Sequence, residues 1–165
     1  MGESSEVQLM LSLLDQAFDR PSWHGTNLRG SIRGVSSKQA AWRPGPKRHN
    51  IWEIVVHAAY WKYAVWRRLT NRRRGSFPLK GSNWFRRPQR GTEQEWRSDR
   101  ALLDDMHRSL RESVANLTTK ELSGRLKRSR ITRGFIISGA AAHDLYHAGQ
   151  IQLLKKLHDH STFAS

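Results

Sequence analysis

The chain has 165 residues, enough for one hydrophobic core, and we expect residues 1–165 to form a single domain. It contains no cysteine, which excludes disulfide bonds and thiolate metal ligands and is typical of a cytoplasmic protein. The formal net charge is +15. No apolar run approaches the roughly 18 residues of a membrane span, so we expect no membrane partner.

Four segments have the apolar periodicity of amphipathic helices. The first runs from about residue 5 to 19, the second from about 50 to 71, the third starts at residue 92 with a buried stripe that reaches residue 117, and the fourth runs from residue 132 or 134 to 158. Asn50 with Glu53 and Thr92 with Glu95 have the spacing of capping boxes. Residues 21–48 are expected to be irregular, apart from a short turn at residues 37–41, and glycines and prolines predict a loop before residue 92.

This pattern predicts an all-α fold, a four-helix bundle with long connections after helices 1 and 2. The charge is concentrated: no acidic residue lies between Ile54 and Thr92, where ten lysines and arginines occur. Such a surface attracts small acidic molecules and nucleic acid, and it is equally consistent with a solvated basic face.

Histidines carry the strongest chemical signal. His143 and His147 lie four residues apart in the apolar fourth helix and therefore share one face, while His57 lies on the apolar second helix. Three neutral imidazoles and a water form the ligand set of an open, zinc-type site. The alternative is that each histidine is satisfied by a backbone carbonyl or a hydroxyl. The other histidines are interpreted as non-ligands: His24, His49, His107, His158 and His160.

Neighbouring residues suggest secondary roles. Gln150, about one turn beyond His147, either orients a ligand in catalysis or packs as an amide between helices. Asp144 points about 100° away from His143, which favours a role as acceptor for a histidine N–H on a neighbouring helix. Tyr146 is expected to pack between helices. Helical spacing places four tryptophans in the core and leaves three in loops that can line a pocket mouth: Trp52, Trp61, Trp66 and Trp96, and Trp23, Trp42 and Trp84.

Three pieces of the chain resemble the DinB-like superfamily of metal-binding four-helix bundles. They are residues 18–25 (FDRPSWHG), 51–57 (IWEIVVH) and 143–151 (HDLYHAGQI), in the order expected for the family. The resemblance implies a metal triad made of His57, His143 and His147. The chain departs from the family in its strong positive charge, which leaves the identity of the substrate open.

The resemblance also implies a range of activities, because members include S-transferases and isomerases that use low-molecular-weight thiols. An open divalent transition metal, with zinc and nickel as the leading candidates, can activate a thiol or a water. We therefore expect a metal-dependent enzyme acting on a small-molecule substrate by S-transfer or hydrolysis, with a thiol as a second cofactor. The alternatives are a nucleic-acid-binding protein and a bundle with a purely structural metal. Exposed apolar surface in the long connections would support a homodimer.

Overall fold

The computed structural model describes residues 5–163, with side chains to residue 160, and the regular elements in this range are all helices. Four are long: α1 (Ser5–Phe18), α4 (Ile51–Leu69), α5 (Glu93–Ala115) and α7 (Arg133–Phe163). Three are short: α2 (Leu28–Ser31), α3 (Ser37–Ala41) and α6 (Thr119–Ser123). The prediction of an all-helical fold is confirmed. None of the described helices is long and apolar enough to cross a membrane.

The predicted elements and the observed ones differ mainly in the connections. The short turn at Ser37–Ala41 occurs as predicted and forms α3. Helices α2 and α6 were not predicted, because four or five residues are too few to show a helical period. Helix α7 continues to Phe163, beyond the predicted end at His158.

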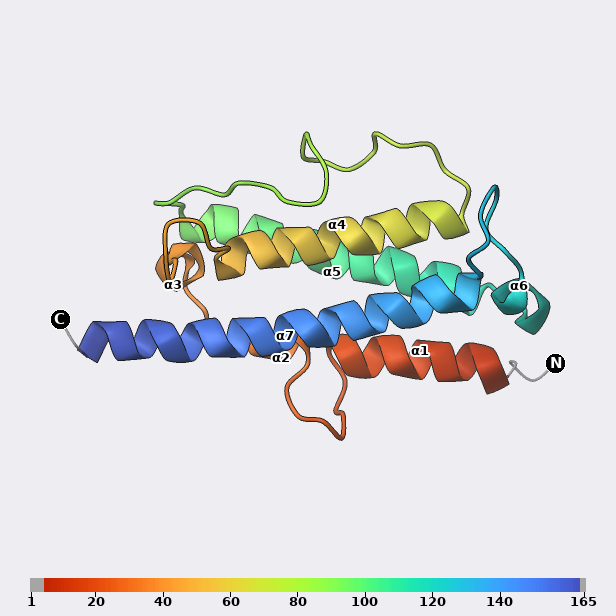
Figure 1. Ribbon diagram of the computed structural model, residues 1–165, viewed down its shortest axis with the longest axis horizontal. Coiled ribbons are helices and arrows are strands. Elements are labelled where there is room, and N and C mark those ends of the chain that lie inside the picture. Colours follow the sequence, from red (N-terminus) through yellow and green to blue (C-terminus); the bar gives the residue numbers. More distant parts are fainter. Residues whose placement is uncertain (1–4, 164–165) are drawn as a thin grey trace.

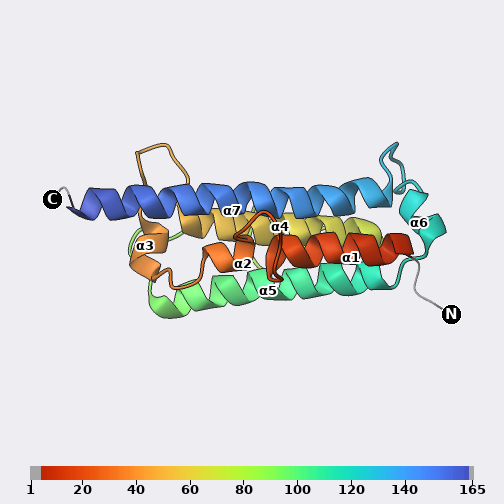
Figure 2. The same ribbon diagram turned by 90° about the horizontal axis from the view of Figure 1, so that it is seen from below.

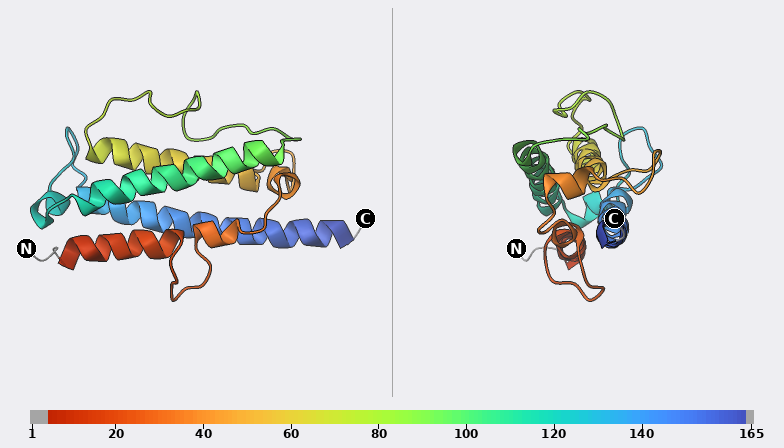
Figure 3. Two further views of the ribbon diagram at one scale, coloured as in Figure 1. Left: turned by 180° about the vertical axis from the view of Figure 1, so that it is seen from behind. Right: turned by 90° about the vertical axis from the view of Figure 1, so that its left-hand side faces the viewer.

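The long helices lie side by side, as the end-on view in Figure 3 shows. Helix α4 packs on α5, α1 packs on α7, and α4 also contacts α7 (Figure 1). Helix α2 continues along the line of α1 (Figure 2). The connection from residue 70 to 92 runs back along α4 (Figure 1), which brings this loop over the helix that carries His57.

The helix starts are fixed by side chains, although not all as expected. Thr92 and Glu95 form the predicted capping box of α5. Asn50 caps α4 by accepting a hydrogen bond from the Glu53 backbone N–H at 2.8 Å. The Glu53 carboxylate does not complete a capping box there. It binds the Arg43 guanidinium at 2.5 Å and the His49 ring at 2.9 Å, and these contacts tie the chain before α4 to the start of that helix.

The core consists of two apolar clusters with buried polar residues between them along the long helices. One cluster consists of residues from the N-terminal parts of α4 and α5 and the C-terminal half of α7. The other consists of residues from α1, the C-terminal parts of α4 and α5 and the N-terminal part of α7. On each of the three shared helices a buried polar residue lies between the two clusters in sequence, and α7 has His147 there in addition: Lys62 on α4, His107 on α5 and Asp144 on α7. We call these three residues the polar layer.

Two aromatic residues, Trp61 and Tyr146, are more exposed than the helical periodicity predicted. Trp52 and Trp96 are fully buried, as expected, and Trp66 is half-buried. Trp61 is 40% exposed and donates a hydrogen bond to the Asn83 side chain, because its face of α4 meets the loop instead of another helix. Tyr146 is 64% exposed and does not pack between helices.

The loop before α5 contains a position that only glycine fits. A Cβ atom on Gly91 would lie 2.6 Å from Cζ3 of Trp52. The indole cannot retreat, because it is fully buried and its Nε1–H donates to Asp99 at 2.6 Å. We therefore expect Gly91→Ala to lower the free energy of unfolding by about 1–3 kcal/mol through overpacking, measured by urea denaturation.

Gly45→Ala is the matched control for this prediction. Its added Cβ would meet only the Arg48 side chain at an ordinary 3.7 Å. Its free energy of unfolding should stay within about 0.5 kcal/mol of the parent. Equal stability of the two variants would contradict the packing described for Trp52.

Candidate metal centre

Helices α4 and α7 bring the three predicted histidines together. The Nε2 atom of His143 lies 3.2 Å from Nε2 of His57 and 3.1 Å from Nε2 of His147. One ligand atom from each of the three residues lies within 4.8 Å of the other two. The described residues add no fourth histidine, aspartate or glutamate to this group. We call it the histidine cluster.

The other ring nitrogens of two of these histidines are held by oxygen atoms. Nδ1 of His57 lies 2.8 Å from the backbone carbonyl of Asn83, and Nδ1 of His147 lies 2.7 Å from Oε1 of Gln150. A carbonyl oxygen only accepts, so in each neutral ring Nδ1 carries the hydrogen and Nε2 carries a lone pair. Both rings therefore present a metal-binding nitrogen to the centre of the cluster, in the way that outer hydrogen bonds orient metal ligands in proteins.

This arrangement fits a cation. The Nε2 atom of His143 lies within hydrogen-bond distance of two lone pairs, and it carries at most one hydrogen. At least one of these two lone pairs therefore has no hydrogen to accept within the cluster. A divalent transition metal between the three nitrogens would bind both of these lone pairs and that of Nε2 of His143 in its unprotonated form.

Burial keeps the cluster in its metal-binding protonation state. Desolvation lowers the pKa of His57 to about 4 and that of His143 to about 3, and it also lowers the pKa of His147. All three rings are then neutral at pH 7. Neutral imidazole is the form that binds a metal, so no proton has to be removed first.

Aromatic rings surround the cluster on the side of the loop. Trp84 stacks on His57 with ring centroids 3.8 Å apart and on His49 with ring centroids 3.6 Å apart, and it also contacts His147 edge-on at 6.3 Å. Trp84 therefore lies at the site, as predicted for a loop tryptophan. Two other loop tryptophans do not: Trp23 is fully exposed, and Trp42 packs on His158. His49 was interpreted as a non-ligand and is not part of the cluster, but it stacks on the ring that covers His57.

Comparison with known protein families identifies the family of this chain. The sequence pattern of the DinB superfamily matches residues 22–151, which is most of the chain. The chain belongs to the DinB superfamily. No curated protein and no solved structure matches the chain significantly. The matched region of this DinB protein contains all three residues of the histidine cluster and Gln150.

The polar layer lies directly beside the histidine cluster. The Lys62 ammonium forms a buried ion pair with Asp144, the residue that follows His143, and it donates to Nδ1 of His107 at 3.2 Å. The expectation that Asp144 accepts from a histidine on a neighbouring helix is wrong, because its partner is a lysine. Breaking such a buried pair leaves one charge uncompensated, so Lys62 and Asp144 fix how α4 and α7 pack together.

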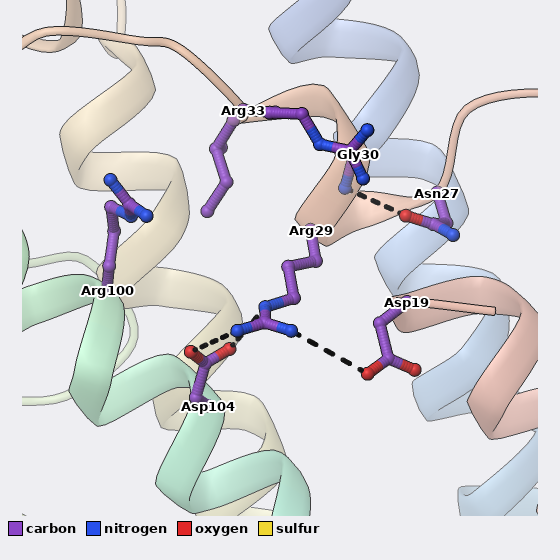
Figure 4. A pocket seen from close by; sticks show the side chains of 8 residues that line it. Asp19, Asn27, Arg29, Gly30, Arg33, Arg100 and Asp104 are labelled. Atoms are coloured by element: carbon purple, nitrogen blue, oxygen red, sulfur yellow. Dashed lines mark hydrogen bonds and ion pairs between the residues drawn. The ribbon is translucent and has the colours of Figure 1, made fainter.

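A separate cavity between α2 and α5 does not involve the cluster. Its volume is about 240 Å³, and Arg29 on α2 bridges Asp104 on α5 and Asp19 after α1 (Figure 4). Arg100 on α5 and Arg33, which follows α2, also line this cavity. These ion pairs tie α1, α2 and α5 together at the surface, and we interpret the cavity as structural.

His107 should make stability depend on pH. It is buried, stacks on Phe18 at 3.8 Å and accepts from Lys62, and burial with the nearby Lys62, Arg111 and Arg29 lowers its pKa to about 2. The unfolded chain binds a proton at His107 near pH 6.5, whereas the folded chain does not, so this contribution to stability is present above that pH and is lost as the pH falls. Between about pH 5.5 and 4, the slope of unfolding free energy against pH should therefore be about 1.4 kcal/mol per pH unit smaller in His107→Phe than in the parent.

Urea denaturation at several pH values measures this slope independently of the absolute stability of the variant. His24→Phe is the control, since His24 is exposed in a loop and its replacement should leave the slope unchanged. An unchanged slope in His107→Phe would mean that His107 takes up its proton in the folded protein.

Proposed function

We propose that this chain is a four-helix-bundle metalloenzyme in which His57, His143 and His147 hold one divalent transition metal, zinc or nickel. The substrate is a small molecule, and the reaction is S-transfer or hydrolysis. The observation that carries the proposal is the convergence of three neutral Nε2 atoms with no fourth protein ligand among the described residues. A closed structural site normally has four protein ligands, so three support an open, catalytic one.

The chemistry divides between the metal and the chain. When bound, the metal lowers the pKa of a thiol or a water so that its nucleophilic form is available at neutral pH. The Asn83 carbonyl and the Gln150 side chain hold the rings of His57 and His147 in the orientation that presents Nε2. Gln150 acts through His147 in this description and is a positioning residue.

A groove beside the cluster supports a small-molecule substrate. It has a volume of about 980 Å³ and lies between α4 and residues 74–83 of the loop. Trp61 and Asn83 line it, and both also contact the cluster: the Trp61 ring lies 6.4 Å from His57 and 6.2 Å from His143. None of the three histidines lines the groove, so it lies next to the proposed metal position, with Trp61 and Asn83 bordering both.

The lining of the groove supports an acidic substrate with an apolar body. Four aromatic and four cationic side chains are among the residues that line it: Tyr60, Trp61, Tyr63 and Phe77, and Arg67, Arg68, Arg74 and Lys80. No acidic residue lines it. His57, Trp61, Ala64 and Arg68 follow one face of α4 at helical spacing, so Arg68 lies roughly 16 Å along the helix from His57. An anionic group bound at Arg68 would leave the other end of an extended molecule near the metal.

Metal binding by single variants tests the proposal. Calorimetric titration with zinc or nickel should give one site per chain, and His143→Ala should abolish tight binding because it leaves two imidazoles. Gln150→Ala keeps all three ligands and should weaken binding by about 10-fold to 100-fold, because the His147 ring loses its orienting acceptor.

His160→Ala is the control, since His160 is exposed near the end of α7 and should bind metal as the parent does. The loaded parent should then turn over a low-molecular-weight thiol with an electrophile, or hydrolyse an acidic ester, and His143→Ala should do neither. Stoichiometric metal binding that survives His143→Ala would refute the ligand set.

Nucleic-acid binding is the second candidate function, and a basic surface that adjoins the groove and shares Arg67 and Arg68 with it favours this function. Six cations and two other residues line a hollow at the C-terminal end of α4 and the loop before α7, and none of the six forms an ion pair with a described carboxylate: Arg67, Arg68, Arg72, Arg73, Lys127 and Arg128. If DNA binds there, the logarithm of the association constant falls linearly with that of the salt concentration. Arg73→Ser with Arg128→Ser should reduce the slope by about 2.

The matched control removes the same charge elsewhere, with Lys38→Ser and Lys156→Ser at exposed positions on α3 and α7. A slope that falls equally in both double variants would indicate a response to net charge alone and would count against a dedicated nucleic-acid surface.

A further inference from the structure

The outer face of α7 is apolar and has no partner within the described chain. Six of its exposed residues are spaced by four, three, four, three and four positions, which places them on one face of the helix: Phe135, Gly139, Ala142, Tyr146, Gly149 and Leu153. Phe135, Tyr146 and Leu153 are 68%, 64% and 59% exposed. We call these six residues the α7 seam; it is about 27 Å long at helical rise.

The seam is also free of charge, in contrast to the rest of the protein. Between Arg133 and Lys155 the only aspartate, glutamate, lysine or arginine is Asp144, which is buried against Lys62. Two copies of a chain with a net charge of +15 repel each other over most of their surfaces. A neutral apolar face of this length is where two copies can meet without placing like charges in contact.

The order of residues in the seam is complementary to itself. If two α7 helices pack antiparallel about a two-fold axis beside residue 144, Phe135 lies opposite Leu153 and Gly139 lies opposite Gly149, while Tyr146 lies opposite Ala142. Large residues then meet each other at the two ends, small residues let the helices approach closely, and each tyrosine ring fits over a small side chain. A parallel pair would instead place Tyr146 against Tyr146.

We propose that this protein forms a two-fold homodimer through the antiparallel packing of two α7 seams. The seam adjoins the histidine cluster: Ala142 precedes His143, and the Tyr146 ring lies 5.1 Å from that of His147. In the dimer Tyr146 of one copy covers Ala142 of the other and so forms a wall beside the other copy's His143. This last consequence for catalysis rests on the proposed function, whereas the dimer itself does not.

Sedimentation equilibrium of the full chain tests the proposal, because it measures mass in solution. The parent should have twice the 19.1 kDa mass of the chain. Phe135→Glu should be monomeric, because it buries an unpaired charge in the seam, and so should Leu153→Lys. The double variant F135E/L153K should be a dimer again, since the antiparallel arrangement brings each new glutamate against a lysine of the other copy.

Trp23→Glu is the control, because Trp23 is the most exposed large apolar residue and lies in a loop outside the seam; it should remain dimeric. Helix content by circular dichroism and zinc titration of each variant report whether the fold and the histidine cluster survive, so loss of the dimer and loss of the metal site are separate results. A monomeric parent, a dimeric F135E, or a monomeric F135E/L153K would each overturn the proposal.

Discussion

Three imidazole lone pairs that face one point repel one another unless a cation lies between them. The chain holds two of the three rings in this arrangement through their remote nitrogens, with a backbone carbonyl of the loop on His57 and the Gln150 amide on His147. Burial removes the alternative of protonation by lowering the pKa values of the cluster. The fold therefore holds the imidazole nitrogens close together, and a divalent metal bound between them would remove the repulsion between their lone pairs. This is the physical basis of the proposed activity.

A buried ion pair, the two apolar clusters and the loop before α5 hold the histidine-bearing helices α4 and α7 in place. Lys62 and Asp144 form a buried ion pair one residue from His143, and such a pair tolerates little sliding of one helix along the other. The apolar clusters on both sides of the polar layer exclude water from it. The loop from residue 70 to 92 adds the Asn83 carbonyl and the stacked Trp84, so the site needs the loop as well as the helices.

The sequence predicted those features that depend on helical periodicity. The four-residue spacing of His143 and His147 predicted that they share a helix face. The apolar residues around His57 predicted that it lies in the interior. Trp84 was predicted at a pocket mouth, but its stacking on His57 and the Asn83 carbonyl contact could not be predicted, since a loop of Gly, Pro and Arg has no period from which to infer its path. The Lys62–Asp144 pair was missed although a signal existed: each residue is an isolated charge within a long apolar stretch, and such charges are buried only in pairs.

Exposure is the property that periodicity predicted least well. Trp61 and Tyr146 were assigned to the interior because they are large and lie on apolar helices, yet Trp61 is 40% exposed and Tyr146 is 64% exposed. Trp61 faces a groove that only the loop creates, and Tyr146 lies on a face of α7 that no other part of the described chain covers. In both cases the sequence shows a large aromatic residue on an apolar helix. Whether that residue is buried depends on which part of the chain lies opposite it, and helical periodicity does not give this.

X-ray absorption spectroscopy of the zinc-loaded protein tests whether three histidines hold the metal, because it counts and identifies the ligands. We expect three imidazole nitrogens at about 2.0 Å and one further ligand, either a water oxygen or the sulfur of an added thiol at about 2.3 Å. Fewer than three imidazoles, or a fourth ligand supplied by the protein, would contradict this expectation.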